Sequence, residues 1–213
     1  MHRVLSILTV ACASHAAASE AVTRFGIVEL PRLDLPGDTF TNPIAINDAG
    51  QITGESGSSL TTIGMHAFLW APGQPMIDLD QGAWPWTTGL RINQAGVMAG
   101  DATFCPEQDG ACAAQPILLQ NDGTILELGP VYVGSLVVTG INEQNQVIYN
   151  RADEGDSFSV LPHQWSPSTG DSMLPIPSTS FTGRALDQND AGVVVGYSLG
   201  GGYIPHIWTD GTI

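Results

Sequence analysis

Apolar and polar residues alternate along this chain in short runs, and Gly, Asn or Pro residues separate one run from the next. Alternation with a period of two is typical of half-buried β-strands, and Gly and Asn between the runs are typical of tight turns. No segment combines a helical period of apolar residues with capping residues. The pattern therefore predicts an all-β protein made of many short strands.

One stretch of this pattern, residues 45–54, recurs at residues 91–100, 140–149 and 189–196. A second stretch, which ends in Trp or Leu, lies downstream of each copy, at residues 67–70, 116–119, 162–165 and 205–208. Each copy of the first stretch carries an Asn at the same place, and the spacings between these Asn residues are 46, 49 and 47: Asn47, Asn93, Asn142 and Asn189. The chain therefore consists of about four copies of one unit.

Each unit has the same predicted order of elements. A first strand ends just before the Asn, a short turn follows, and a second strand ends near a Gly. A longer loop then leads to a third strand, a hairpin turn and a fourth strand. Blades of β-propellers contain four antiparallel strands in about 40 to 50 residues. The sequence predicts a β-propeller-like array of about four four-stranded antiparallel blades.

The fourth unit stops shortly after its third strand. In one arrangement, residues 25–30 supply the missing strand and close a four-bladed ring. In the other, the chain is a truncated arc of a larger propeller, and the last repeat is incomplete. The second arrangement is favoured, because ring closure would make the residues after Trp208 redundant and because an unclosed array exposes strand edges.

The first residues resemble an export signal: His2 and Arg3 precede an apolar stretch, residues 4–13, and small residues follow. Cleavage after Ala18 would leave residues 19–213 as the repeat domain. Lipoprotein processing at Cys12 is a weaker alternative, because Thr9 stands where a large aliphatic residue is usual. We expect an extracellular or periplasmic protein without a transmembrane segment after the signal, since no later apolar run could span a bilayer.

Composition agrees with a folded protein and restricts its partners. Hydrophobic residues make up 43% of the chain, and six Arg face 21 acidic residues, which gives a formal net charge of −15. Such a surface repels phosphate backbones, so nucleic acid is excluded as a partner. Cations and neutral polymers remain possible partners, including an extracellular glycan or a cell-surface component. The alternative is that the charge only keeps the protein soluble.

Removal of the signal leaves two cysteines, Cys105 and Cys112. In an oxidising compartment an even number of thiols predicts a disulfide, here across one long loop. Free thiols are harder to maintain outside the cytoplasm. A metal site is disfavoured because no second thiol pair or nearby His completes it.

The residues Ile-Asn-Asp-Ala-Gly-Gln-Ile-Thr-Gly at 46–54, followed by His-Ala-Phe-Leu-Trp at 66–70, resemble the HAF repeat of bacterial extracellular proteins. Later copies depart from it: Gln94 replaces the Asp, and Asn145 replaces the Gly. The resemblance covers nearly all of the mature chain. It implies an exported repeat protein and assigns no catalytic residues.

Residues that recur in every copy are best interpreted as structural, because the repeat itself requires them. Three aromatic residues at one repeat position, Trp70, Trp165 and Trp208, are expected to fill space between blades. His163 and His206 occupy equivalent repeat positions and are expected to pack rather than to bind a metal, since a metal site needs several converging ligands. His66, at a neighbouring position, is expected at the start of a strand. No cofactor is predicted. Calcium remains a weak alternative, because residues 187–192 approach a calcium loop but lack an oxygen ligand at Ala191.

In a four-stranded meander, the turns between the first two strands and between the last two emerge at one rim. The longer loops emerge at the other rim, which carries the irregular residues and is where we expect any ligand to bind. The candidate contacts are Trp84, Trp86, Asp101, Asp109, Asp153, Asp156 and Tyr203. Aromatic rings there could stack on sugars, and carboxylates could accept hydroxyl hydrogen bonds. The alternatives are that the Trp residues are buried and that the acidic residues form a solvated face.

Common catalytic signatures are absent from the sequence, including His-Glu-x-x-His and Gly-x-Ser-x-Gly. The sequence therefore favours a non-enzymatic binding or adhesion scaffold. A propeller-type carbohydrate-active enzyme is the alternative, because Asp78, Glu127 and Glu29 occupy matching repeat positions and paired carboxylates can hydrolyse glycosidic bonds.

Overall fold

The computed structural model describes residues 26–33, 39–57, 65–79, 86–104, 112–120, 123–153 and 156–209. The chain divides into two units, Met1–Leu30 and Pro31–Ile213, and every strand of the described residues lies in the second. In the described part of the chain there is no helix, and hence no helix that could cross a membrane. The expectation of an all-β protein is confirmed.

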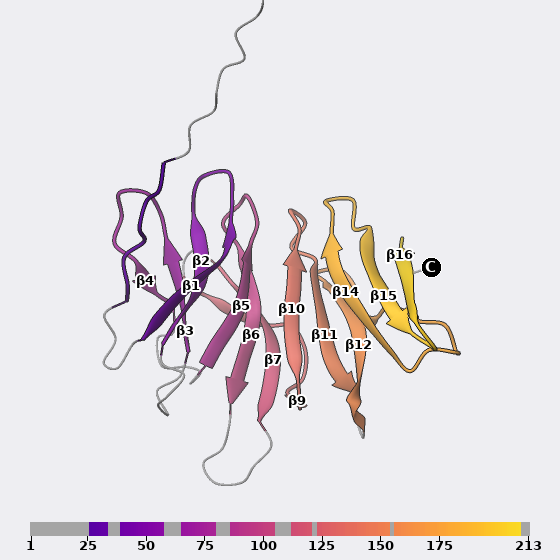
Figure 1. Cartoon of the computed structure of the whole chain (residues 1–213). Coiled ribbons are helices and arrows are strands. Elements are labelled where there is room, and N and C mark those ends of the chain that lie inside the picture. Colours follow the sequence, from indigo (N-terminus) through magenta and orange to yellow (C-terminus); the bar gives the residue numbers. More distant parts are fainter. Residues whose placement is uncertain are drawn as a thin grey trace, which may run out of the picture. The chain divides into compact units, whose positions relative to one another are not determined.

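The strands form four antiparallel sheets, called blades 1 to 4, in sequence order (Figure 1). Blade 1 contains β1 (Phe40–Ile46), β2 (Ile52–Gly57), β3 (His66–Trp70) and β4 (Ile77–Asp78). Blade 2 contains β5 (Trp86–Ile92), β6 (Met98–Phe104), β7 (Ala113–Leu119), β8 (Ile125–Glu127) and β9 (Tyr132–Val133). Blade 3 contains β10 (Leu136–Ile141), β11 (Val147–Asp153), β12 (Asp156–Ser166) and β13 (Gly170–Met173). Blade 4 contains β14 (Thr182–Gln188), β15 (Val194–Leu199) and β16 (Tyr203–Trp208).

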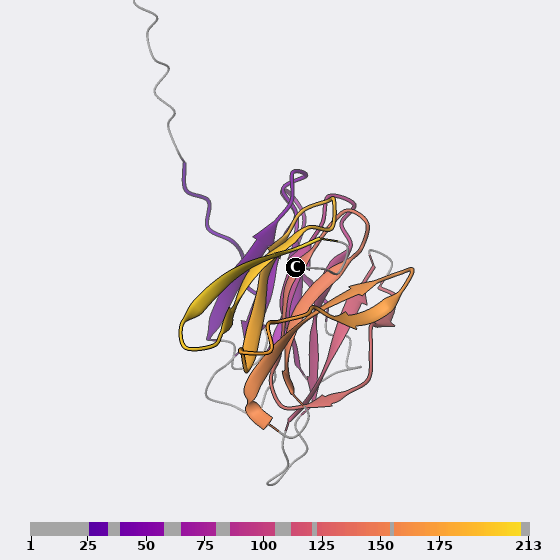
Figure 2. The ribbon, with the colours of Figure 1, turned by 90° about the vertical axis from the view of Figure 1, so that its right-hand side faces the viewer.

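This is a propeller-like array, as the repeat predicts. The first strands of neighbouring blades, β1, β5, β10 and β14, contact one another in order. Viewed along the array, the blades lie one behind another (Figure 2). Each blade is a meander whose strands pair in sequence order, so turns between first and second strands emerge at one rim and loops between second and third strands at the other.

Two details differ from the simple four-strand unit. Blade 2 has an additional short strand, β9, which pairs with β7 within the connection to blade 3. Blade 4 has three strands in the described residues, and residues 26–33 adopt no regular secondary structure. Phe25, with which the proposed closing strand begins, lies outside the described residues.

Every first strand contains a bulge before the recurring Asn, which the alternation of apolar residues does not reveal. The register shifts between Pro43 and Ala45, Thr88 and Arg91, Val138 and Gly140, and Ala185 and Asp187. A bulge adds one unpaired residue and increases the local twist of the strand. The first strand of each blade is therefore bent at the same place, just before the Asn turn.

The turn after each recurring Asn needs one residue with a left-handed backbone, three positions after the Asn. Gly50, Gly96 and Gly192 have φ values of 76°, 82° and 75°, and Asn145, which replaces Gly in the third copy, has a φ of 58°. Asn is among the few residues other than Gly that tolerate this conformation. The departure of the third copy from the repeat therefore preserves the turn.

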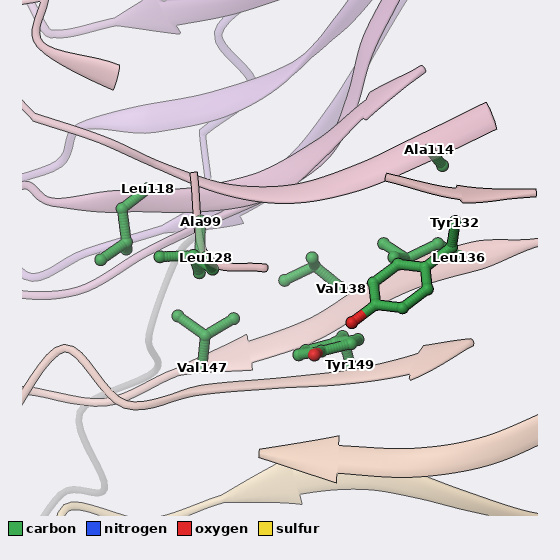
Figure 3. Packing of buried hydrophobic residues seen from close by; sticks show 9 residues of the cluster. All are labelled: Ala99, Ala114, Leu118, Leu128, Tyr132, Leu136, Val138, Val147 and Tyr149. Atoms are coloured by element: carbon green, nitrogen blue, oxygen red, sulfur yellow. The ribbon is translucent and has the colours of Figure 1, made fainter. Parts of the chain in front are cut away.

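Apolar side chains fill the space between successive blades. The largest cluster joins blades 2 and 3, and Figure 3 shows its Leu, Val and Tyr side chains meeting between the strands. Ala67 and Leu90 pack with Met98 between blades 1 and 2. Trp208 is 1% exposed and packs with Ile148 between blades 3 and 4, and Trp165 packs against the cluster between blades 2 and 3, so these two fill space between blades as expected. Trp70 is partly buried and belongs to none of these clusters.

Candidate functional site

The recurring Asn side chains link each blade to the next by hydrogen bonds. The Nδ2 atoms of Asn47, Asn93 and Asn142 donate to the backbone carbonyl of the next Asn in the series, at 3.1, 3.1 and 3.2 Å. The Oδ1 atom of each Asn accepts a backbone N–H of its own turn, for example from Val97 to Asn93 at 2.9 Å. We call this series the Asn ladder: Asn47, Asn93, Asn142 and Asn189.

A second series of hydrogen bonds runs beside the Asn ladder, one residue further along. The backbone N–H groups of Asp48, Gln94 and Glu143 donate to the side-chain oxygens of the equivalent residue in the next blade. The acceptors are Gln94, Glu143 and Asp190, at 2.8, 2.6 and 3.1 Å. Each of these residues carries a side-chain oxygen, so the substitution of Gln94 for Asp keeps the bond. The recurring polar residues are thus structural, as expected.

A polar hollow of about 440 Å³ opens at the rim that carries the Asn turns, between blades 3 and 4. Its lining comes from the Asn turns of both blades, from β12, and from the hairpin that joins β12 to β13. The described residues that line it are Gln146, Gln164, Ser166, Ser168, Thr169, Asp171, Ser172, Ala191 and Gly192. Hydroxyl and amide groups dominate this lining, and Asp171 is the carboxylate among these residues.

Asp171 is held in one orientation by two buried side chains behind it. Its Oδ1 atom accepts hydrogen bonds from the Tyr149 hydroxyl at 2.5 Å and from His163 Nδ1 at 2.9 Å. The rings of Tyr149 and His163 stack with their centroids 5.3 Å apart. The Oδ2 atom has a longer contact, 3.5 Å, from the Tyr132 hydroxyl. One carboxylate oxygen is therefore fully used by the protein, and the other is weakly bonded.

The charge on Asp171 follows from these contacts. Partial burial raises its pKa, but the hydrogen bonds from His163 and Tyr149 and the positive charge of Arg151 outweigh this, so the pKa lies below its ordinary value. The carboxylate is consequently ionised at neutral pH. Burial and the adjacent carboxylate raise the pKa of the Tyr149 hydroxyl, which therefore remains a donor.

The other lining groups hydrogen-bond within the rim. Gln164 Nε2 donates to Gln188 Oε1 at 3.3 Å, and Gln188 Nε2 donates to the Gln146 carbonyl at 2.7 Å. Ser166 Oγ lies 2.7 Å from Thr169 Oγ1. These groups are fixed by the hairpin and by the neighbouring blade, and they present amide and hydroxyl atoms to solvent. Such a surface suits a neutral ligand rich in hydroxyl groups.

The structure places the predicted contacts at different depths. Tyr203 is 73% exposed and meets Tyr197 edge to face, with ring centroids 5.0 Å apart. Trp84 and Asp109 lie outside the described residues. Trp86, Asp153 and Asp156 belong to β5, β11 and β12, and their side chains are outside the described part.

Asp101 is buried between blades 2 and 3, at 5% exposure, rather than on an exposed rim. Its Oδ2 atom accepts a hydrogen bond from the Thr88 hydroxyl at 2.7 Å. Burial raises the pKa of Asp101 to about 6, although hydrogen bonds from Thr88 and from the Val138 backbone favour the ionised form. Asp101 therefore lies in the interface between blades 2 and 3.

His163 and His206 are buried as expected, and His66 begins β3 as expected. His163 and His206 are 3% and 8% exposed, and His206 Nε2 lies 2.7 Å from Ser198 Oγ. His66 Nδ1 lies 3.0 Å from Asp78 Oδ2 on blade 1. Within the described ranges, no three His, Cys, Asp or Glu side chains gather as a metal site.

Sequence reasoning missed the hollow, because no motif marks its residues. Gln146, Gln164 and Ser172 come from three separate elements and become neighbours only when the blades pack. Aligning the repeats gives one signal that could have pointed to the hollow. Gln164 stands in the third copy where Leu69 and Leu118 stand in the first two, so a polar side chain replaces an interblade apolar one.

No family model and no curated protein matches this sequence. Among solved structures, the fold is similar to TolB from Acinetobacter baumannii, with a TM-score of 0.52 and 13% sequence identity. The similarity covers 78% of this chain and 40% of that one, so the chain spans less than half the length of the structure it matches. At this identity the likeness supports the propeller-like fold alone.

Proposed function

We propose that this chain is an exported, non-enzymatic binding scaffold of the HAF-repeat type, which receives a neutral, hydroxyl-rich ligand such as an extracellular glycan. The polar hollow between blades 3 and 4 carries the proposal. Its volume of about 440 Å³ is within the range typical of small-molecule sites, roughly 300 to 1,000 Å³. Its position on a rigid repeat frame suits binding without conformational change.

The chemistry of the hollow favours recognition over reaction. Gln164 and Ser172 share the face of blade 3 towards blade 4 and can exchange hydrogen bonds with a ligand hydroxyl. The Asp171 side chain is on the opposite face of blade 3, where it bonds Tyr149 and His163. Glycosidases of the common kind need a second carboxylate placed across the scissile bond. The described lining residues supply one carboxylate, so binding is the function that this site supports best.

The export signal and the resemblance to HAF repeats support a location outside the cytoplasm, either extracellular or periplasmic. The strongly acidic composition is compatible with a neutral ligand and unfavourable for an anionic one. Calcium is not needed for the proposed contacts, so binding should persist in the presence of a chelator.

An array of neutral and acidic glycans, followed by calorimetry with the oligosaccharides that bind, tests the proposal. Ser172→Trp places a large ring in the hollow and should abolish binding. Glu127→Trp introduces the same ring on β8, an outer strand of blade 2, and should leave binding intact. Both variants must first show wild-type circular dichroism and thermal midpoints.

The binding results of these variants distinguish which of the two rims holds the ligand site. Loss of binding in Tyr203→Ala, with Ser172→Trp unaffected, would move the site to the rim of longer loops and refute the hollow. Absence of binding to every glycan would refute the ligand class. Release of reducing sugar by the wild-type protein would indicate a carbohydrate-active enzyme.

A further inference from the structure

The interface between blades 3 and 4 carries three amide side chains at positions that are apolar in the interface before it. Between blades 2 and 3, three apolar side chains pack in or against the cluster at these positions: Val97, Leu118 and Ile141. At the same repeat positions one blade further on stand three glutamines: Gln146, Gln164 and Gln188. Amide groups therefore replace apolar packing at this one interface.

A backbone group fixes the orientation of two of these amides. The Gln146 carbonyl can only accept, and Gln188 Nε2 donates to it at 2.7 Å. The Oε1 atom of Gln188 therefore faces Gln164 and accepts a hydrogen bond from Gln164 Nε2 at 3.3 Å. The other amide atom of Gln164, Oε1, receives no hydrogen bond from the described residues. It is left as an acceptor.

The third amide, that of Gln146, is fixed in the opposite sense. Asn142 Oδ1 accepts the backbone N–H groups of Gln144 and Gln146, at 3.1 and 2.9 Å. Asn142 Nδ2 consequently donates to Gln146 Oε1, at 2.6 Å. Within the part of the chain that the structure describes, Gln146 Nε2 has no acceptor. It is left as a donor.

This donor and this acceptor line the same polar hollow. Gln164 pairs with Ile148 across β12 and β11, so Gln146, two residues before Ile148, is its diagonal neighbour, at about 7 to 8 Å along the sheet. The Gln146 amide also lies against Gly192 of blade 4, where an added Cβ would be 2.9 Å from Gln146 Oε1. Ala191, next to this Gly, lines the hollow with a methyl group.

The outer part of the interface is open to solvent in other blades as well. Ser172, which pairs with Gln164, is exposed. The equivalent residues Ile77 and Leu126 are 48% and 43% exposed, although blades 2 and 3, which follow them, each have a fourth strand. This opening gives a ligand access to the two amides.

We propose that the hollow binds the acetamido group of a neutral N-acetylated amino sugar, an inference that rests on the proposed function. The acetamido N–H donates to Gln164 Oε1, its carbonyl accepts from Gln146 Nε2, and its methyl group packs on Ala191. The hydroxyl groups of Ser168 and Ser172, on the same lining, bond the ring hydroxyls.

The fixed amides favour this group over the alternatives. A sugar hydroxyl donates and accepts through one oxygen atom, whereas an acetamido group presents its donor and its acceptor on separate atoms, as the hollow does. A peptide amide has the same two atoms but brings no ring hydroxyls for the serines. Carboxylated sugars are disfavoured by the net charge of −15.

Calorimetry with three β-1,4-linked trimers tests the inference, because these sugars differ only at the second carbon. The N-acetylglucosamine trimer should bind roughly tenfold or more tightly than the glucose trimer, since it gains two hydrogen bonds. The glucosamine trimer is cationic and has no acetyl group. Measured at high salt, which screens the acidic surface, it should bind no better than the glucose trimer.

Variants that install the residues of blade 2 test the assignment of the two atoms. Gln164→Leu and Gln146→Val should each reduce the affinity for the N-acetylated trimer to that for the glucose trimer. Gln188→Ile releases the Gln164 amide from its fixed orientation and should weaken the preference without changing the affinity for the glucose trimer. Gln120→Leu removes an exposed amide after β7 and is the matched control, with the preference unchanged.

Equal affinities for the N-acetylated and glucose trimers, or a glycan array led by sugars without acetamido groups, would overturn this inference and leave the proposed function intact. A preference that survives in both Gln164→Leu and Gln146→Val would overturn it as well. Tighter binding of an acetylated, amidated trialanine peptide would assign the hollow to peptides instead. Binding to no glycan at all would overturn both proposals.

Discussion

Asn93→Ala removes a central member of the Asn ladder, and its effect on stability can be worked out from the contacts. The Asn93 side chain is 3% exposed and makes three hydrogen bonds: to the Asn142 carbonyl at 3.1 Å, to Asn145 Oδ1 at 2.9 Å and from Val97 N–H at 2.9 Å. A hydrogen bond contributes about 1 kcal/mol net, and a buried group left without a partner costs more. We expect a loss of roughly 3 to 5 kcal/mol in the free energy of unfolding.

Asn189→Ala is the matched control, since it makes the same change at the same repeat position. The Asn189 side chain is exposed, and among the described residues its hydrogen bonds come from the N–H groups of Ala191 and Val193 in its own turn, which water can replace. We expect a loss of about 1 kcal/mol. The two variants thus differ in the interblade bonds and in burial.

Equilibrium unfolding in urea, followed by tryptophan fluorescence and by circular dichroism, measures both losses. The two probes must give coincident transitions, because repeat arrays can unfold in stages. Losses that agree within about 0.5 kcal/mol between the two variants would refute the ladder as a source of stability. The recurring Asn would then serve only its local turn.

Three further results are expected. Gly196→Ala should lower the thermal midpoint strongly, because the added Cβ would lie 2.0 Å from the Arg184 carbonyl oxygen. Gly202→Ala is the control and should have little effect, because no atom lies within 4 Å of its added Cβ. Folding raises the pKa of Asp101 from 3.8 to about 6, so the free energy of unfolding should fall by roughly 3 kcal/mol as the pH rises from about 4 to 7. In Asp101→Asn, unfolding in urea at the same pH values should no longer show this fall. Alkylation and mass spectrometry of protein purified from the periplasm or the medium should find Cys105 and Cys112 joined in a disulfide. Two thiols that react without prior reduction would contradict the pairing.

The blades could be predicted because their determinants are local. Each first strand ends one residue before the recurring Asn, at Ile46, Ile92, Ile141 and Gln188, as the repeat indicates. The left-handed turn position could be inferred from Gly50, Gly96 and Gly192, and Asn145 is one of the few substitutions that satisfies it. In these segments the alternation of apolar residues, the turn residues and the repeat spacing all predict the same strand ends.

The contacts between blades could not be predicted, because they join residues nearly fifty positions apart. The sequence shows that Asn47 and Asn93 recur, but not that the amide of one reaches the carbonyl of the other. The bulges carry no sequence mark, since Ile44 and Thr139 sit at equivalent bulged positions and share no property beyond β-branching. The hollow is lined by residues of two packed blades, so it could not be predicted either.

One residue expected on the ligand-binding rim, Asp101, was misplaced for a related reason. Asp101 was expected on that rim because it follows a strand and precedes an irregular loop. The second strand of blade 2 continues to Phe104, so Asp101 lies within β6 and turns into the interface with blade 3. Strand ends are difficult to place from alternation alone, and a shift of a few residues changes a surface carboxylate into a buried one.

The Asn ladder also bears on how such a chain can lengthen during evolution. Asn93 and Asn142 each donate one side-chain hydrogen bond to the next blade and accept one, at the backbone carbonyl, from the preceding blade. A unit that a tandem duplication inserts would therefore have a partner for this hydrogen bond in the blade before it and in the blade after it. The number of blades can change in single steps, and selection then acts on whether the resulting array closes.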